Sequence, residues 1–312
     1  MVIGLDAGGT KLLGASLDGA LELGPRVRHP WAGEDRDATL DVIARVVEEI
    51  RSGAPGVGAV GLGVPSLVDW PSGVSRWSSH LPLDDVPLRE LMAERLGLPV
   101  VVDNDANAAV LAEHRAGAAK DCENAVLVAL GTGIGGALVI GGQVYRGAHG
   151  WAGEFGHVVV DHDGADCPGD CPGRGCLEAL ASGRAIGVAG ERAALAEPDS
   201  PLGRQLAESG AVFGQAVTQL AHDGDETARA VLADVGRRLG AGLTGIVNTL
   251  DPDVVVIGGG AVTAGDLLLD PARKVVATRA LPPAARAARI VPARFGEEAG
   301  VLGAALLARE LL

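Results

Sequence analysis

In the N-terminal part of the chain, some apolar residues form short continuous runs. Between these runs lie segments in which apolar residues recur at the spacing of a helix. Residues 1–17 read VIGLD, AGGT and KLLGASL, which predicts a strand, a tight turn and a second strand. Apolar runs at 57–64 and 99–102 predict two further buried strands. Three helices are predicted between and after these runs, from apolar spacing, helix-forming residues and an Asn-Asp start that can cap the third: residues 38–52, 88–96 and 105–116.

The second half repeats this order. Residues 124–130 predict a strand, GTGIGG at 131–136 a turn, and residues 137–140 another strand followed by a Gly-Gly hairpin turn. A loop rich in Gly, Pro, Asp and Cys follows at 161–176, and a wide apolar stripe predicts a long helix over 228–250. The run DVVVI then predicts a buried strand that ends in three glycines.

Two similar halves therefore each begin with a strand, a Gly-Thr turn and a second strand. This duplication predicts an α/β fold of two lobes with a central cleft. We place the boundary within 115–123, which gives a small α/β lobe of residues 1–118 and a large α/β lobe of residues 119–298. The apolar C-terminal segment, about residues 299–312, is expected to form a helix that packs back on the small lobe.

Composition narrows the class of protein. The chain has 312 residues, of which 47% are apolar and 21% charged, as in globular proteins. A net charge of -14 argues against nucleic acid or an anionic membrane as the main partner. We find no secretory signal and no apolar stretch long enough to cross a bilayer, and four cysteines in such a chain indicate thiols or metal ligands. A cytoplasmic location is expected.

The two glycine turns suggest phosphate binding. Residues 6–10 read DAGGT and residues 131–136 read GTGIGG; glycines let backbone N–H groups approach a phosphate, and Thr adds a hydroxyl. The second turn matches G-x-G-x-x-G, but a strand follows it where a dinucleotide fold requires a helix. Both segments could be ordinary hairpin turns. Alternatively, Asp6 orients a Mg²⁺-bound water while the turns hold a polyphosphate.

A polar triplet, Asp103-Asn104-Asp105, stands between a predicted strand and a predicted helix. It could simply cap the helix. Phosphoryl transfer to an alcohol, however, needs a carboxylate near the hydroxyl to accept its proton, and Asp105 is our candidate for that general base.

Four residues around the Cys-rich loop form a candidate zinc site: His157, Cys167, Cys171 and Cys176. Thiolate and imidazole ligands suit a closed, tetrahedral, structural Zn²⁺, and the alternative is free thiols in a flexible loop. Such a zinc would fix the loop that presents Glu178 and would orient His157. Cys122 stands apart, and we interpret it as a small buried residue.

The motifs together resemble the ROK family of sugar kinases and repressors. DAGGTK, DNDANAA at 103–109, LGTGIGG, GEFGH at 153–157 and GCLE at 175–178 occur in the family's order and cover essentially the whole chain. The resemblance implies the two-lobed, actin-like (ribonuclease-H-like) ATPase fold. PDVVVIGGG at 252–260 is similar to the adenosine-side motif of that superfamily.

The resemblance also implies roles for individual residues. Asp105 would be the catalytic base, and the hexose would be bound by Asn104, Asp105, Glu154, His157 and Glu178. ATP with its Mg²⁺ would be bound by the glycine segments and their neighbours, namely Asp6, Gly8, Gly9, Thr10, Lys11, Gly131, Thr132, Gly133, Gly258, Gly259 and Gly260. For Glu178 the alternative is a first-turn acid at a helix N-terminus.

The chain departs from the family pattern at four places. Asp103 replaces a Glu common there, and the cysteines read C-x3-C-x4-C where the family usually has C-x-C-x4-C, which leaves the middle ligand Cys171 less secure. Ser66 stands where a second Gly is usual, and His80 where Asn is frequent. The last two changes affect the expected recognition of sugar hydroxyls.

The sequence thus predicts an ATP-dependent hexose kinase, with glucose to glucose 6-phosphate as the first expectation. Fructokinase, mannokinase and N-acetylmannosamine kinase remain open, and polyphosphate is a less expected donor. A repressor of the same family would carry a DNA-binding helix-turn-helix ahead of the sugar domain, whereas here the first predicted strand starts at Met1. Asp6 and Asp105 argue against a non-catalytic sugar-binding protein. We expect a homo-oligomer, either a dimer or a tetramer.

Overall fold

The first sheet lies entirely in the N-terminal part of the chain. The computed structural model describes residues 1–8, 11–30, 35–78 and 80–312. The sheet has the strand order β3-β2-β1-β4-β7, built from β1 (Val2–Ala7), β2 (Lys11–Leu17), β3 (Val27–Pro30), β4 (Val60–Val64) and β7 (Val100–Asn104). β1, β2 and β3 pair antiparallel, whereas β1, β4 and β7 run parallel. The carboxyl ends of these three parallel strands therefore meet at one edge.

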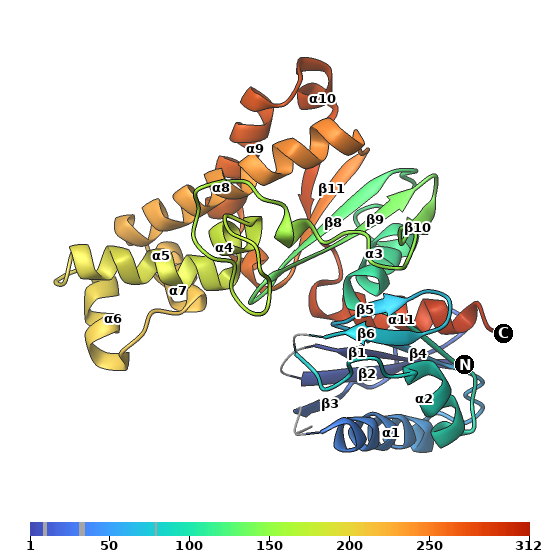
Figure 1. Cartoon of the computed structure of the whole chain (residues 1–312). Coiled ribbons are helices and arrows are strands. Elements are labelled where there is room, and N and C mark those ends of the chain that lie inside the picture. The colour runs from blue at the N-terminus through green and yellow to red at the C-terminus, as the bar shows by residue number, and fades with distance from the viewer. Residues whose placement is uncertain (9–10, 31–34, 79) are drawn as a thin grey trace. The chain divides into compact units, whose positions relative to one another are not determined.

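Helices cover both faces of this sheet (Figure 1). α1 (Arg36–Gly53) packs on β2 and β3, and its apolar stripe joins the core formed by β1 and β4. α11 (Ala299–Arg309) packs on the other side, against β1, β4 and α3 (Asp105–Ala116). Since both faces are covered, β1 and β4 are buried along almost their whole length. The same part of the chain contains the β5–β6 hairpin (Leu67–Asp69 and Val74–Trp77) and α2 (Leu88–Leu96).

The second sheet repeats the strand order of the first. Its order is β10-β9-β8-β11-β12, from β8 (Ala125–Leu130), β9 (Ile134–Ile140), β10 (Gln143–Tyr145), β11 (Val254–Gly258) and β12 (Ile290–Pro292). β9 and β10 form an antiparallel hairpin, and β8, β11 and β12 run parallel. The duplicated α/β architecture predicted from the two strand–Gly-Thr–strand patterns is confirmed at the level of sheet topology.

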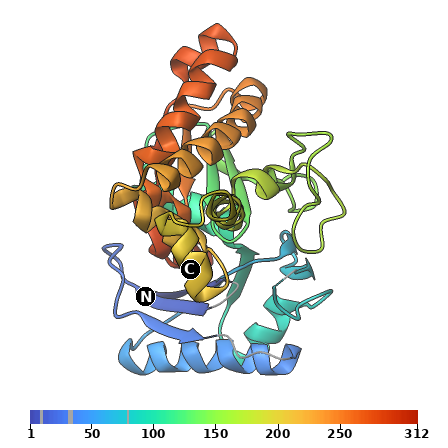
Figure 2. The same ribbon diagram turned by 90° about the vertical axis from the view of Figure 1, so that its left-hand side faces the viewer.

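The helices of the second half follow the Cys-rich loop. They are α4 (Leu177–Ala181), α5 (Gly183–Ala196), α6 (Pro201–Ser209), α7 (Gly214–His222), α8 (Glu226–Leu250), α9 (Asp266–Arg279) and α10 (Pro282–Ala287), with short 3-10 turns η1 (Phe155–His157), η2 (Gly260–Ala264) and η3 (Gly296–Glu298). α8 packs along α9 and also contacts α4, α5 and α7. In Figure 2 the irregular loop before α4 projects from the side of this helical group.

The chain divides into two compact units. Unit 1 comprises residues 1–121, 137–153 and 297–312, and unit 2 comprises residues 122–136 and 154–296. The boundary expected from the sequence assigned all of 119–298 to one lobe, whereas residues 137–153 group with unit 1. The physical reason is that β10 packs against α3. α11 also lies in unit 1, on β1 and β4.

The observed elements agree with most of the predicted ones and add several. The helices predicted at 38–52, 88–96, 105–116 and 228–250 are present, and the last two begin within two residues of their predicted starts. β3, the β5–β6 hairpin, α5 to α7, α9, α10 and β12 were not predicted. Among the described residues, no helix combines the length and apolar character needed to span a bilayer.

Candidate active site

Three candidate site residues of unit 1 lie at the carboxyl edge of the first sheet. Asp6 in β1 pairs with Gly63 in β4, and Gly63 pairs with Asp103 in β7. Asn104 ends β7, and Asp105 begins α3. The register of three parallel strands therefore brings Asp6 and the 103–105 triplet to the same edge, although almost a hundred residues separate them in sequence.

Asp6 lies in a partly buried, negatively charged environment. Burial raises the pKa of Asp6 from its ordinary value to about 7; the negative charge of Asp105 adds to the rise, and Lys11 opposes it. The backbone of α11 passes so close that a Cβ at Gly300 would lie 2.6 Å from Asp6 Oδ2. Glycine at position 300 therefore leaves the room that the Asp6 carboxylate occupies. A carboxylate held this way is poised to accept a cation.

Asn104 is the N-cap of α3. Its Oδ1 accepts hydrogen bonds from the backbone N–H groups of Ala106, at 2.9 Å, and of Asn107, at 3.3 Å. Oδ1 of Asp105 also accepts from the N–H of Ala106, at 2.8 Å. The capping interpretation of the polar triplet is therefore correct for Asn104. Asp105 occupies the first turn of the helix, where this bond to Ala106 orients its carboxylate.

Of the other candidate residues in the first glycine turn, the structure describes Gly8 and Lys11. Gly8 follows β1, and Lys11 begins β2 with its Nζ paired to Glu297 Oε2 at 2.8 Å. Lys11 and Arg28 hold the pKa of the Glu297 carboxyl below its usual range, with the Lys11 hydrogen bond as the main cause. Gly9 and Thr10 lie outside the described residues.

The second glycine turn belongs to unit 2 and connects β8 to β9. The N–H of Gly131 donates to the carbonyl of Gly133, at 2.9 Å, and the carbonyl of Gly131 accepts from the N–H of Gly183 at the start of α5. Thr132 is exposed. The third glycine segment, 258–260, follows β11, which is the parallel neighbour of β8. Both glycine segments of unit 2 therefore lie at the carboxyl edge of their sheet.

Glu178 contacts the second glycine turn directly. It stands in the first turn of α4, and its Oε2 accepts a hydrogen bond from the N–H of Ile134 at 2.7 Å. A Cβ at position 133 would lie 2.2 Å from the same oxygen, so only glycine at 133 permits this approach. Glu178 is thus a first-turn acid, and it also braces a candidate phosphate turn.

Glu154 directly precedes η1, and His157 is its last residue. Glu154 Oε2 lies 4.0 Å from His157 Nε2. Burial raises the pKa of Glu154, the His157 imidazole opposes the rise, and Glu178 adds to it. Glu154, His157 and Glu178 thus form one polar group in unit 2 that can offer carboxylate and imidazole groups to a neutral, hydroxyl-rich ligand.

The four predicted zinc ligands come together in space. One ligand atom from each of His157, Cys167, Cys171 and Cys176 lies within 4.8 Å of all the others. In a tetrahedral site with Zn–S bonds of about 2.3 Å, neighbouring sulfurs are about 3.8 Å apart, so the cluster is close to the size required. Burial raises the pKa of the Cys167 and Cys176 thiols, and a bound dication would reverse that shift. The donor set and its spacing fit a structural zinc ion.

Sequence reasoning missed two residues beside the catalytic candidate. Arg146, just after β10, pairs with Asp103, and its guanidinium lies over the Trp70 ring. Neither position belongs to a motif. Of the two departures on the sugar side, His80 is exposed, and Ser66 is buried with a hydroxyl that has no hydrogen-bond partner within the described ranges.

Cys122 also differs from expectation. The sequence suggested a buried residue, but its side chain is partly exposed and its Sγ accepts a hydrogen bond from Arg289 Nη2 at 3.3 Å. It takes no part in the metal cluster.

Comparison with known proteins connects these features to one family. A glucokinase of Streptomyces coelicolor is 36% identical over 99% of this chain and 98% of its own length. A putative xylose repressor of Caldicellulosiruptor is 35% identical over 87% of this chain and 68% of its own length. The crystal structure of a ROK family glucokinase from Streptomyces griseus, in complex with glucose and AMPPNP, superposes with a TM-score of 0.88 at 33% identity and covers 99% of both chains. The sequence model of the ROK family matches residues 2–311, and the chain belongs to the ROK family.

Proposed function

We propose that this chain is an ATP-dependent hexose kinase that transfers the γ-phosphoryl group to the 6-hydroxyl of glucose. The observation that carries the proposal is that the Asp6 and Asp105 carboxylates lie near each other at one sheet edge, in a chain similar over its full length to a glucokinase. The Streptomyces griseus glucokinase, which matches this chain over 99% of its length, was crystallised with glucose and AMPPNP, and this supports glucose and ATP as the substrates here.

Asp105 acts as the general base in this proposal. The Asp105 carboxylate accepts the proton of the sugar hydroxyl and aims the hydroxyl oxygen at the phosphorus. The first turn of α3 holds the side chain at a fixed position, because Oδ1 of Asp105 is bonded to the N–H of Ala106. A base anchored in this way loses little entropy when the hydroxyl arrives.

The glycine segments and Asp6 bind the nucleotide in this proposal. MgATP supplies the phosphoryl group and a cation that spreads its negative charge. Asp6 accepts a hydrogen bond from a metal-bound water or faces the metal, which favours its ionised form. Backbone N–H groups of the turns at 8–11 and 131–133 donate to phosphate oxygens, and Gly258, Gly259 and Gly260 border the adenosine.

Asn104, Glu154, His157 and Glu178 bind the hexose hydroxyls. A site built to hydrogen-bond hydroxyl groups rejects analogues that lack them, because buried donors and acceptors are then left unpaired. His157 would bind zinc through one ring nitrogen and direct the other toward Glu154 and the sugar. The zinc ion, held by His157 and the three loop cysteines, is structural.

Replacing Cys171 with serine tests the zinc assignment. Purified protein should contain about one zinc per chain, and Cys171→Ser should lower both the zinc content and the thermal midpoint, since a structural site contributes folding free energy. The KM for hexose should rise, because the same loop leads through Cys176 into α4 and Glu178. Cys122→Ser is the matched control, since Cys122 lies outside the cluster. Full zinc occupancy in Cys171→Ser would remove Cys171 from the ligand set.

A hexose panel tests the function itself. Glucose, fructose, mannose and N-acetylmannosamine, each offered with ATP and with polyphosphate, should give the highest kcat/KM for glucose with ATP. The similarity to a putative xylose repressor makes sugar binding without turnover the competing outcome. Binding of a sugar with no phosphorylation under any donor would reject the kinase proposal in favour of that alternative.

A further inference from the structure

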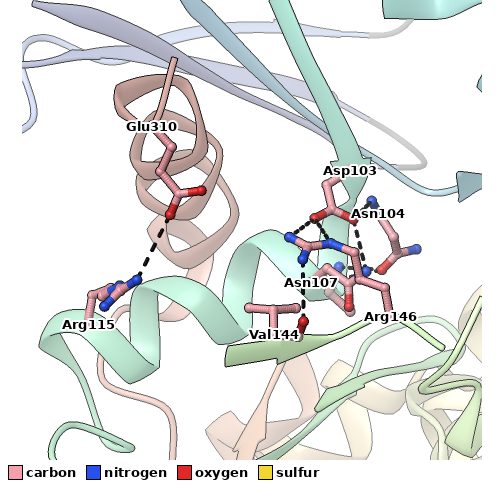
Figure 3. A network of polar contacts seen from close by, with 8 residues as sticks. Asp103, Asn104, Asn107, Arg115, Val144, Arg146 and Glu310 are labelled. Carbon is pink, nitrogen blue, oxygen red and sulfur yellow. Dashed lines mark hydrogen bonds and ion pairs between the residues drawn. The ribbon is translucent and has the colours of Figure 1, made fainter. Parts of the chain in front are cut away.

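The carboxylate of Asp103 is buried and fully hydrogen-bonded at the end of β7. Its side chain is 1% exposed. Oδ1 accepts from the N–H of Asn104, at 2.8 Å, and from Nδ2 of Asn107, at 2.9 Å. Oδ2 accepts from Nε and Nη2 of Arg146, at 2.8 and 2.7 Å. Figure 3 shows these bonds converging on Asp103 from both sides. An ionised carboxylate is stable in such a place only while these partners remain.

Arg146 joins three separate segments of unit 1. Its side chain is 14% exposed, its Nη1 donates to the carbonyl of Val144, and its guanidinium lies 3.9 Å from the centre of the Trp70 ring. The segment just after Arg146 also packs on the strand before Trp70, because a Cβ at Gly150 would lie 2.1 Å from the carbonyl of Val68. One guanidinium therefore connects the end of β10, the end of β5 and the β7–α3 junction. Lysine could not reproduce both the fork and the stacking.

Asn104 links Asp103 to α3 through hydrogen bonds. Its backbone N–H bonds to Asp103, its Oδ1 caps the first turn of α3, and its Nδ2 donates to the carbonyl of Ser66 at 3.3 Å. Asp105 is the next residue and lies inside that capped turn. Any shift of Asp103 therefore moves the Asn104 amide and the Asp105 carboxylate together.

We propose that Arg146 is a positioning residue for the hexose side of the site, acting through Asp103 on Asn104 and Asp105. The proposal rests on the kinase function above, because it assigns those two residues to sugar binding and proton acceptance. Its effect falls on hexose KM and on kcat. KM for ATP stays nearly constant, since none of the groups that Arg146 contacts is assigned to the nucleotide.

The same helix offers a matched control. Arg115, near the other end of α3, pairs with Glu310 at 3.9 Å, and both side chains are about half exposed (Figure 3). Arg115→Gln and Arg146→Gln each remove one guanidinium group, the first from α3 itself and the second from beside its N-terminal end. The first change breaks a solvent-screened pair, and the second leaves a buried carboxylate without its cation.

Kinetics of the full chain give the first readout. Arg146→Gln should raise the hexose KM about tenfold and lower kcat about tenfold, since small misplacements of a base or a ligand group have effects of this order or larger. Arg146→Lys, which keeps the charge, should fall between parent and Arg146→Gln and protects the test against a folding failure. Arg115→Gln should match the parent. Hexose KM and kcat within about twofold of the parent in both Arg146 variants would overturn the proposal.

A double-mutant cycle with Asp103→Asn tests whether Arg146 acts through Asp103. Neighbours that act as a unit are not additive, so Asp103→Asn should reduce kcat/KM for hexose less in the Arg146→Gln background than in the parent. Full additivity of the two changes would show that Arg146 acts by some route other than Asp103 and would reject the proposal.

Amide hydrogen exchange gives a readout that does not depend on activity. The N–H groups of Ala106 and Asn107 are held by Asn104, so Arg146→Gln should speed their exchange, while amides of α8 exchange as in the parent. If the parent phosphorylates no hexose, the kinase function fails and this exchange alone decides the positioning role. Unchanged exchange at Ala106 and Asn107 would reject it.

Discussion

Asp105→Asn should lower kcat for hexose phosphorylation by about 10²–10⁴-fold, the usual contribution of a general base. The amide keeps the shape of the carboxylate, and its Oδ1 can still accept the N–H of Ala106 that now anchors Asp105. Binding of the hexose should therefore change little, as measured by titration calorimetry without nucleotide. Only the ability to take the hydroxyl proton is removed.

A second carboxylate in a first helical turn controls for effects on helix stability. Asp37 stands in the first turn of α1 and is exposed. Asp37→Asn should lower stability by about 0.3–1 kcal/mol through the helix dipole and leave kcat unchanged. If Asp105→Asn retains more than about a tenth of the parent kcat, a contribution far below that of a general base, Asp105 is not the base.

Local pattern was sufficient to predict the elements that carry Asp6 and Asp105. β1 and β7 are short continuous apolar runs, and α3 is rich in helix-forming residues after an Asn-Asp start that can cap it. The polar triplet at 103–105 marks the junction of a strand and a helix. The proximity of Asp6 and Asp105 could not be predicted from local pattern. It depends on β4 pairing with both β1 and β7, which the sequence suggests only through the resemblance to a family of known fold.

The metal cluster was predictable for a chemical reason. Three cysteines within ten residues, together with His157, form a thiolate and imidazole donor set of the kind that holds a structural zinc ion. The changed spacing around Cys171 made its role the weakest part of that prediction. In the structure the loop brings Cys171 Sγ beside the other three ligand atoms.

Arg146 and the Glu178 contact could not be predicted in the same way. Arg146 pairs with a residue 43 positions earlier, and nothing around it repeats or alternates. The bond from the Ile134 N–H to Glu178 spans 44 positions and needs a glycine at 133 for room. Contacts of this kind are fixed by the tertiary path of the chain, and a single sequence carries no local signal for them.

Asp6→Asn should abolish most activity and, at the same time, stabilise the protein at pH 8 when Mg²⁺ and nucleotide are absent. The activity loss is expected at about 10²–10³-fold or more, as for removal of a group that stabilises charge in the transition state. The gain in stability has a separate cause. Burial and the charge of Asp105 raise the pKa of Asp6 to about 7, so its ionised form is unfavourable in the folded chain.

The sign of the pH dependence follows from that raised pKa. Asp6 takes up its proton more readily in the folded state than in the unfolded state, whose carboxyl titrates near 3.9. Its contribution to stability is therefore complete below about pH 4 and is lost as the pH rises through about 7. A pKa increase of this size corresponds to about 4 kcal/mol at most. Asp6 is only partly buried in the folded chain, and solvent screening reduces the effect to about 2 kcal/mol.

Denaturant unfolding at several pH values, without Mg²⁺ and nucleotide, measures this effect. The free energy of unfolding of Asp6→Asn should equal that of the parent near pH 4 and exceed it by about 2 kcal/mol at pH 8. Asp41→Asn, which removes one exposed charge from α1, should show no such trend. Mg²⁺ with a non-hydrolysable ATP analogue should stabilise the parent more than Asp6→Asn at pH 8, because a cation favours the ionised carboxylate. A difference between Asp6→Asn and the parent that stays constant from pH 4 to 8 would show that Asp6 is not destabilised by its charge.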